Sequence, residues 1–314
     1  MSLILKMLNK KIKIIVTGGC GFLGSHLVDK LIHEKFLVFV IDNLSTGSLK
    51  NLNSKAKFFF SDIEDENQLE NIFKQVKPHF VFHLAAKINT SIKEESPTND
   101  VNNQIIGSLN LMKLSVQYNV EKFFYGSSVA VYGKQSIFPV KEDAIKLPDT
   151  SYGICKLFTE KYLEYYCKFY KLKYMSLRYS NIYGDRQKII GEVGVVAIFL
   201  NNLLKKKKLN IFGNGKLTRD FISVYDSVEL TYRCLHSKYI GPINIASGEE
   251  ITTNKITIEL KKYFSDLKYI YKKSRINEIK RFKCDIKRMT KVLGGLKQNF
   301  NKSLKKTIIK TINT

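Results

Sequence analysis

The sequence has few of the features that mark membrane-spanning, secreted or disordered proteins. Its 314 residues contain only five prolines, which argues against a disordered, proline-rich chain. No stretch of about 18 apolar residues occurs, so no membrane-spanning helix is expected. The apolar part of the N-terminal MSLILKMLNKK is too short for the core of a signal peptide. We therefore expect a cytoplasmic protein without a membrane partner.

The cysteines form no disulfide or metal-ligand pattern. The chain has no CxxC pair, and its five cysteines are scattered, at Cys20, Cys155, Cys167, Cys234 and Cys284. An odd, scattered set fits a reducing compartment better than a disulfide framework. It also lacks the spacing of the common zinc sites, so no metal is expected.

Acidic residues are scarce relative to basic ones. The chain has 28 Asp and Glu against 52 Lys and Arg, which gives a net charge of +24. Such an excess is compatible with nucleic-acid binding. However, the lysines are spread along the whole chain, and runs such as KKKK at 205–208 are short. We favour solvated lysine-rich faces over a nucleic-acid partner, and note that a positive field would also attract a phosphorylated substrate.

Short apolar runs alternate with segments of helical periodicity. The apolar runs predict strands at 11–17, 36–42, 57–63, 80–86, 122–128 and 173–183. The periodic segments predict helices at 25–34, 66–75, 103–118, 153–170 and 194–204. Strands that are apolar throughout and alternate with helices are typical of a parallel sheet covered on both faces. We therefore predict the α/β class, with a doubly wound parallel Rossmann sheet.

The alternating pattern loosens after about residue 184, which predicts two domains. We expect a nucleotide-binding Rossmann domain at 11–183, to which segments near 222–246 return. Residues 184–314 then form mainly a smaller α/β substrate-binding lobe. In open α/β sheets ligands bind at the carboxyl ends of the strands, and we expect the lobe to lie over that edge.

The segment TGGCGFLG lies between the first predicted strand and the first predicted helix. It places Gly18, Gly21 and Gly24 three residues apart. Glycine is needed where the backbone turns tightly or approaches a diphosphate closely, and the following helix start offers free N–H groups to the anion. A tight strand-to-helix turn without a ligand is the alternative. In this context we favour a dinucleotide-binding turn.

Two aspartates follow the next two predicted strands. Asp42 ends the second strand, where a carboxylate can bind both hydroxyls of an adenosine ribose and would repel a 2′-phosphate. This position favours NAD over NADP, although a simple turn aspartate is the alternative. Asp62 ends the third strand and is a candidate for contact with the adenine or, equally, for a helix cap.

The segment SYGICK places Tyr152 and Lys156 four residues apart, which is one face of a helix. Tyr–Lys pairs with this spacing recur at 118 and 122 and at 269 and 273. Only the pair at 152 and 156 follows a strand end that carries a serine in the right place, Ser128. An ammonium and a positive nicotinamide ring would lower the pKa of the phenol toward the range of a general base. We predict that these three residues act in proton abstraction beside a bound NAD.

With these motifs the sequence resembles the extended short-chain dehydrogenase/reductase family, in particular its NAD-dependent nucleotide-sugar epimerases. The resemblance runs from about residue 12 to about residue 300. The segments that carry it are TGGCGFLGSHLV, DNLSTG, HLAA, DVNNQIIGSLNLM, SSVAVYG, SYGICK, LRYSNIYGDRQ, IFGNGKLTRDFISVYD and NIASGEEIT. Any one of these segments is weak evidence, whereas all of them in this order are specific.

The resemblance implies roles for individual residues. The catalytic set would be Ser128, Tyr152 and Lys156, and Asn102 would help to organise the helix that carries the lysine. Sugar-nucleotide contacts would come from Asn181, from Arg219 and Arg275 to the diphosphate, and from Phe282 beside the sugar's 2-substituent. For each arginine a surface salt bridge is the alternative, and for Phe282 a core position is. The NAD contacts would be Gly18, Gly21, Phe22, Leu23, Gly24, Asp42, Asn43, Asp62, Ile63, Leu84, Ala85, Ala86, Asn102, Tyr152 and Lys156.

The resemblance also implies an activity, namely inversion of C4 of a nucleotide-activated hexose of the UDP-glucose type through a transient 4-keto sugar. Relatives that dehydrate or decarboxylate carry acidic residues where this chain has Val129 and Ala130, which favours epimerisation. A sibling dehydratase, decarboxylase or C2 epimerase stays open, as does a non-enzymatic NAD-sensing regulator. Family resemblance further suggests a homodimer formed by the helices near 103–118 and 153–170, unless those helix faces are buried against their own sheet.

Overall fold

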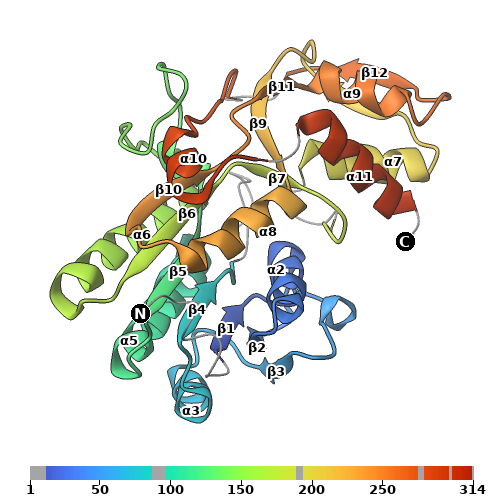
Figure 1. The fold of residues 1–314 in the computed structure, drawn as a ribbon. Helices are drawn as coiled ribbons and strands as arrows, with labels where there is room; N and C mark the ends of the chain where they lie inside the picture. Colours follow the sequence, from blue (N-terminus) through green and yellow to red (C-terminus); the bar gives the residue numbers. More distant parts are fainter. Residues whose placement is uncertain (1–11, 87–96, 189–193, 275–278, 297–298, 313–314) are drawn as a thin grey trace. The chain divides into compact units, whose positions relative to one another are not determined.

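The structure is a computed structural model that describes residues 12–86, 97–188, 194–274, 279–296 and 299–312 (Figure 1). The chain divides into two compact units. The first unit contains residues up to Gly133, Lys146–Arg178 and Val228–Ile243. The second contains Lys134–Ile145, Tyr179–Ser227 and residues from Asn244 onward. Residues 134–145, which lie ahead of the expected boundary near 184, thus belong to the second unit.

A seven-stranded sheet forms the centre of the first unit, in the order β3-β2-β1-β4-β5-β6-β10 (Figure 1). Strands β1 to β5 run parallel. The order reverses between β1 and β4, which makes the sheet doubly wound and confirms the predicted fold class. The strands are β1 (Lys13–Thr17), β2 (Leu37–Asp42), β3 (Lys57–Phe60), β4 (Phe80–His83), β5 (Lys122–Ser128), β6 (Tyr174–Tyr179) and β10 (Gly241–Ile245).

Helices cover both faces of this sheet. On one face α3 (Glu66–Val76), α5 (Gly107–Gln117) and α6 (Ser151–Tyr170) are neighbours and share one apolar core with alternate residues of the strands (Figure 1). On the other face α2 (Phe22–His33) contacts the C-terminal half of α8 (Val224–Arg233), where Lys30 binds Glu229 at 3.1 Å. Because helices cover both faces of the sheet, strand residues that point to either face are apolar, which gives the continuous apolar runs in the sequence.

The helix starts follow local capping chemistry. The hydroxyl of Thr150 accepts a hydrogen bond from the N–H of Gly153 at the start of α6, at 3.1 Å. The carboxylate of Asp65 does the same for Gln68 at the start of α3, at 3.0 Å. Such caps pair backbone donors that the first helical turn leaves free. Asp65, and not Asp62, is therefore the cap of α3, so the helix-cap alternative for Asp62 is wrong.

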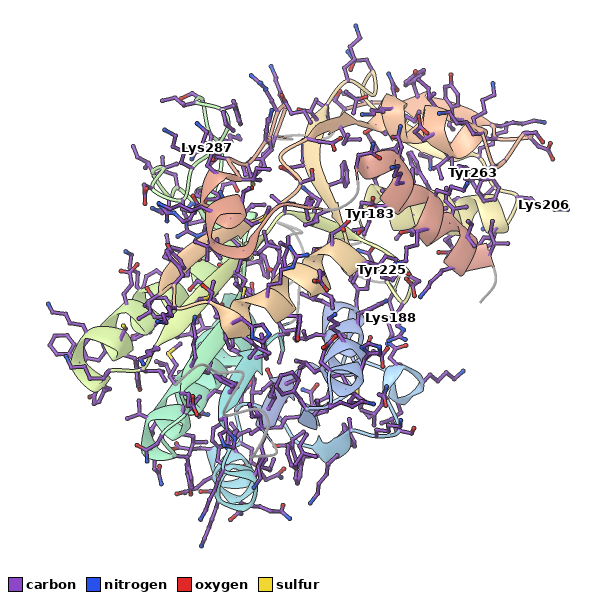
Figure 2. All side chains as sticks on the ribbon, viewed as in Figure 1. Tyr183, Lys188, Lys206, Tyr225, Tyr263 and Lys287 are labelled. Carbon is purple, nitrogen blue, oxygen red and sulfur yellow. The ribbon has the colours of Figure 1, made fainter. Side chains whose placement is uncertain are left out.

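The second unit has its own apolar core. Tyr183, labelled in Figure 2, packs against Phe221 and Phe300 with ring centroids 6.5 and 5.6 Å apart. Its strands are β7 (Asn181–Tyr183), β8 (Leu209–Phe212), β9 (Thr218–Ser223), β11 (Glu250–Thr252) and β12 (Tyr269–Lys272). Its helices are α7 (Val195–Leu204), α9 (Thr253–Lys261), α10 (Lys287–Leu293) and α11 (Phe300–Ile312). Among the residues that the structure describes, no helix combines the length and the apolarity needed to cross a membrane.

Candidate active site

Gly18, in the turn between β1 and α2, and Gly24, in the first turn of α2, leave no room for a side chain. Gly18 has φ +70°, and a Cβ there would lie 2.7 Å from the backbone nitrogen of Ala85. A Cβ on Gly24 would lie 2.1 Å from the carbonyl oxygen of Gly18. Gly21 precedes the first residue of α2, and in the described chain no side chain caps that helix. The turn therefore presents bare backbone, and the uncapped start of α2 offers N–H groups to an anion, which suits the diphosphate of a dinucleotide.

The carboxylate of Asp42 is buried and shaped by the backbone around it. Its oxygens accept hydrogen bonds from the N–H of Cys20 at 2.9 Å and from the N–H of Leu44 at 2.8 Å. The adjoining loop approaches so closely that a Cβ on Gly47 would lie 3.0 Å from the carboxylate. Two N–H donors hold the carboxylate beside the glycine turn, as a ribose ligand requires. Each oxygen keeps a second lone pair to accept a hydroxyl.

The side chains of Asn43 and Asp62, which follow β2 and β3, are hydrogen-bonded to each other. The amide of Asn43 donates to the carboxylate of Asp62 at 2.7 Å. The other oxygen of Asp62 accepts from the N–H of Glu64 at 3.0 Å. Ile63 is buried, and a Cβ on Gly107 would lie 2.4 Å from its side chain. The amide thus fixes Asp62, the candidate for contact with the adenine, beside the end of β2.

The end of β4 is tied to the end of β1. The side-chain oxygen of Thr17 accepts from the N–H of Ala85 at 3.2 Å and bonds Nδ1 of His83 at 2.8 Å. Nε2 of His83 bonds the hydroxyl of Ser108 on α5, at 2.8 Å. Burial lowers the pKa of His83 to about 3, so the imidazole is neutral and bridges two hydroxyls. This bridge holds the half-buried segment with Leu84, Ala85 and Ala86 against the glycine turn.

The three predicted catalytic residues lie in the first unit, on β5 and α6. Ser128 ends β5, and its oxygen accepts from the N–H of Ala130 at 3.2 Å, so its proton remains for another acceptor. Lys156 is buried, and its Nζ donates to the carbonyl oxygen of Gly126 at 2.8 Å. The same Nζ lies 5.5 Å from the ring centroid of Tyr152. The spacing in SYGICK therefore does place the ammonium beside the phenol ring.

The buried ammonium of Lys156 titrates near neutrality. Burial lowers the pKa of Lys156 to about 7, although the thiol of Cys155 and the carboxylate of Glu160 act to raise it. Nζ also lies 4.7 Å from the centroid of the Tyr125 ring, whose negative face favours a cation. A lysine in this state can hold or release a proton close to pH 7.

Gly153 brings the start of α6 against the end of β5. A Cβ at this position would lie 2.7 Å from the carbonyl oxygen of Ala130 in the short 3-10 helix η3 (Val129–Tyr132). A larger residue next to Tyr152 would push α6 away from the strand that carries Ser128. The sequence alone does not indicate Gly153, because nothing in the pattern shows which backbone the helix approaches.

The turn before α5 does not bring Asn102 to the lysine helix, as the family resemblance implies it should. Asn102 is exposed, at the start of the π-helical turn η2 (Asn102–Ile106). Its neighbour Gln104 reaches α6 instead, because its carbonyl oxygen accepts from the hydroxyl of Thr159 at 3.2 Å. The amide of Gln104 is buried and has no hydrogen-bond partner among the described residues. In the described chain, Gln104 is the residue of this turn with a hydrogen bond to the lysine helix.

The predicted substrate residues that the structure describes lie in the second unit. The amide of Asn181 donates to the carbonyl oxygen of Asp220 at 3.0 Å. Arg219 donates to the carbonyl oxygens of Thr218 and Ile279, at 2.9 and 2.6 Å. Phe282 is 3% exposed, as its core alternative predicts. Arg275 lies outside the described residues.

Asp220 organises the segments around Asn181 and Phe282, a role that the sequence alone does not indicate. Its carboxylate accepts from the N–H groups of Ser247, Gly248 and Cys284, at 2.9, 3.0 and 3.2 Å. These donors come from segments far apart in the sequence, so no local pattern could have indicated the role. Burial raises the pKa of Asp220, and these N–H donors act against that rise.

Comparison with known proteins agrees with this arrangement. The family model described as the NAD dependent epimerase/dehydratase family matches residues 14–246. A putative UDP-glucose 4-epimerase of Methanocaldococcus jannaschii is 39% identical over 278 residues, which are 88% of this chain and 90% of that protein. UDP-glucose 4-epimerase of Thermotoga maritima, solved with UDP-glucose, superposes with a TM-score of 0.93 at 39% identity and covers 96% of this chain and 99% of its own. UDP-glucose 4-epimerase of Thermus thermophilus, solved with NAD, gives 0.89 at 31% identity and covers 95% and 98%.

The glycine turn, the carboxylate of Asp42 and the serine, tyrosine and lysine of β5 and α6 fit a bound dinucleotide, and the family model covers all of them. The chain therefore belongs to the NAD dependent epimerase/dehydratase family of extended short-chain dehydrogenases/reductases, and its cofactor is NAD.

Proposed function

We propose that the protein inverts C4 of a nucleotide-activated hexose of the UDP-glucose and UDP-galactose type. The observation that carries this proposal is the ammonium of Lys156, fixed by the Gly126 carbonyl at 2.8 Å and placed 5.5 Å from the Tyr152 ring. A phenol beside a buried cation is a base suited to an alcohol proton. Relatives named UDP-glucose 4-epimerase, alike over most of the chain, support the choice of substrate.

Tyr152 and Ser128 act on the same substrate oxygen in this proposal. Tyr152 takes the proton of the C4 hydroxyl, and Ser128 donates a hydrogen bond to that oxygen. Lys156 stabilises the phenolate through its charge. Bound NAD supplies the hydride chemistry at the sugar carbon. Gly18, Gly21 and Gly24 would hold its diphosphate, and Asp42 would hold its adenosine ribose.

Inversion requires the 4-keto sugar to turn over while the nucleotide stays bound. We assign the binding of the nucleotide part to the second unit, through Asn181, Arg219 and Arg275. An arginine fork matches a diphosphate well, and binding energy from this remote group would retain the reactive keto sugar.

A sibling reaction on another nucleotide sugar is the alternative within the family. A dehydratase or decarboxylase needs an acidic group near the sugar, and η3 has Val129 and Ala130 at the positions where such relatives carry acids. A C2 epimerase would need the proton taken at another carbon. A non-enzymatic NAD-sensing regulator is the alternative of another class, and the intact Ser128, Tyr152 and Lys156 set argues against it.

We also propose that the protein is a cytoplasmic homodimer. Five apolar side chains form one stripe along α6 at helical spacing, and each is 39–58% exposed: Ile154, Phe158, Tyr162, Tyr165 and Phe169. Their exposure contradicts the alternative that this face is buried against its own sheet. An exposed apolar stripe of this size favours a partner helix, and a second copy of α6 would supply one. Five free cysteines support a reducing compartment.

The test is conversion of defined nucleotide sugars followed by ¹H NMR. UDP-glucose, UDP-galactose and their dTDP, CDP and GDP counterparts are incubated with the protein, first without and then with added NAD. The proposal predicts interconversion of one gluco/galacto pair to a fixed ratio, without loss of water or carbon dioxide. A 4-keto-6-deoxy sugar or a C2 epimer as the product would assign the corresponding sibling activity instead. No conversion of any sugar, with NAD bound, would favour the regulator.

A further inference from the structure

A buried ion pair lies one helical turn beyond Lys156. Glu160 on α6 and Arg178 at the end of β6 are each 2% exposed. The guanidinium donates from Nε to Oε1 of Glu160 at 2.9 Å and from NH2 to Oε2 at 2.6 Å. This is bidentate geometry, in which two parallel bonds fix the direction of both side chains. The pair therefore holds α6 against β6 in one orientation.

Each partner of the ion pair also binds the segment that carries Ser128. The hydroxyl of Ser127 donates to Oε1 of Glu160 at 2.6 Å. NH1 of Arg178 donates to the hydroxyl of Tyr132 at 3.0 Å. Ser127 directly precedes Ser128, and Tyr132 ends the η3 helix that Ser128 caps. The pair thus holds the serine segment from both sides.

The same strand end binds α6 at two successive turns. The carbonyl of Gly126 accepts from Nζ of Lys156 at 2.8 Å, and the next residue, Ser127, binds Glu160. Lys156 and Glu160 are four residues apart, so they lie on one face of the helix. The register between β5 and α6 is thereby fixed at two points.

We propose that Glu160 and Arg178 are a positioning pair that sets the placement of Ser128, Tyr152 and Lys156 and the charge that Lys156 experiences. This inference rests on the catalytic roles proposed above. Packing alone could fill the volume between α6 and β6. The two charges also fix the orientation of α6 against β6, because any other orientation would leave a buried ion unpaired, which is costly.

The pair also acts on the titration of Lys156. The ionisable groups that face its ammonium are Cys155, Glu160 and Tyr152 on α6, Tyr125 on β5 and His83 on β4. Of these, the carboxylate of Glu160 raises the pKa of Lys156 against the effect of burial. Removing that charge, with Arg178 still present, lowers the pKa of Lys156 further, because the ammonium loses an attractive neighbour.

The test compares three variants with a matched control. Glu160→Gln and Arg178→Met each leave one buried charge unpaired, and the double variant Glu160→Gln/Arg178→Met removes both charges. The control is Glu164→Gln, which breaks the exposed pair of Lys161 and Glu164, 2.9 Å apart on the same helix. The readouts are thermal unfolding, kcat and KM for the sugar nucleotide, and the titration of Lys156 by NMR of ¹³Cε-labelled lysine.

We expect both single variants to unfold at lower temperature and the double variant to recover most of that loss. The double variant nevertheless loses kcat by roughly tenfold to a hundredfold, with KM within about twofold, because the reacting groups are held less firmly. In Glu160→Gln the titration of Lys156 moves to lower pH, and in Glu164→Gln nothing changes.

Two results overturn the proposal. One is a double variant with the kcat of the control, which makes the pair a folding element only. The other is a Lys156 titration that is the same in Glu160→Gln and Glu164→Gln. The NMR titration needs no substrate, so it decides the charge effect even if the parent protein converts no sugar. A parent protein that converts no sugar would contradict the proposed function instead.

Discussion

Nζ of Lys156 donates a hydrogen bond of 2.8 Å to the carbonyl oxygen of Gly126, two residues before Ser128. A lysine on a helix is thereby fixed to the end of a strand, and its charge is held 5.5 Å from the Tyr152 ring. The bond also explains how a cation can be 98% buried, since the carbonyl and two aromatic rings replace part of its water.

Lys156→Met should lower activity and change how stability depends on pH. Without the ammonium the Tyr152 phenolate loses its stabilising charge, and kcat should fall roughly 10²- to 10⁴-fold. The folded pKa of Lys156, about 7, lies below the ordinary 10.5, so the unfolded chain binds more protons between these values. The free energy of unfolding of the wild type should therefore rise with pH in that window. From pH 7.5 to 9.5 it should rise by about 2–3 kcal/mol more than that of the variant. Urea unfolding at both pH values measures the difference, and parallel curves would contradict the buried ammonium.

Gly153→Ala should reduce catalysis although alanine favours helices. The added Cβ would lie 2.7 Å from the Ala130 carbonyl oxygen, so α6 must move away from η3. A displacement of about 1 Å at Tyr152 should lower kcat roughly a hundredfold, with NAD binding retained. Gly295→Ala is the matched control, because its Cβ meets nothing within 4 Å. Equal kcat for the two variants would show that the close approach is not needed.

His83→Gln should make the protein more tolerant of acid. The folded pKa of His83, about 3, is far below the ordinary 6.5, so its neutral form is present in the fold and the unfolded chain takes up the proton first. The neutral His83 imidazole makes its full contribution to the free energy of unfolding above pH 6.5, and this contribution is lost as pH falls toward 3. Between pH 7 and 5 the wild type should lose about 2 kcal/mol more than the variant. Chemical unfolding at the two pH values tests this, and equal losses would mean that the imidazole is not buried neutral.

Parts of the fold followed from the sequence because they depend on local patterns. The strand expected at 122–128 is β5 with the same bounds, and the helix expected at 153–170 is α6 from residue 151. The glycine turn and the Tyr152–Lys156 spacing are also local, since all their residues lie within one element or turn. The sequence does not predict the seventh strand, β10, as a strand, and indicates only that segments near 222–246 return to the Rossmann domain.

Other features could not be predicted, because they join residues that are distant in the sequence. His83 bridges β1 and α5, and the N–H donors to Asp220 come from two separate segments, 247–248 and 284. Arg178 pairs with Glu160 across two elements. The family resemblance implies a role for Asn102 beside α6, whereas a π-helical turn sets which residue reaches α6. A single sequence contains no information on such pairings beyond the residue types.

The proposed dimer makes a separate prediction about α6. Phe158 and Phe169 are 54% and 58% exposed on the apolar stripe. Phe158→Asp/Phe169→Asp should convert a dimer into a monomer, because two charges would be buried without partners at the interface. Analytical ultracentrifugation measures the mass, and Ile137→Asp, at an exposed apolar residue outside the helix, is the control. A wild-type monomer, or a variant that stays dimeric, would contradict the role of the stripe.

The central claim is that the Tyr152 phenol moves the proton of the reacting alcohol, and Tyr152→Phe tests it with one missing oxygen. The measurement is interconversion of the active nucleotide-sugar pair by NMR, with sugar-nucleotide binding measured in parallel by calorimetry. We predict that turnover falls by at least roughly a thousandfold while the Kd stays within about threefold. Turnover within tenfold of the wild type, with binding intact, would contradict the account.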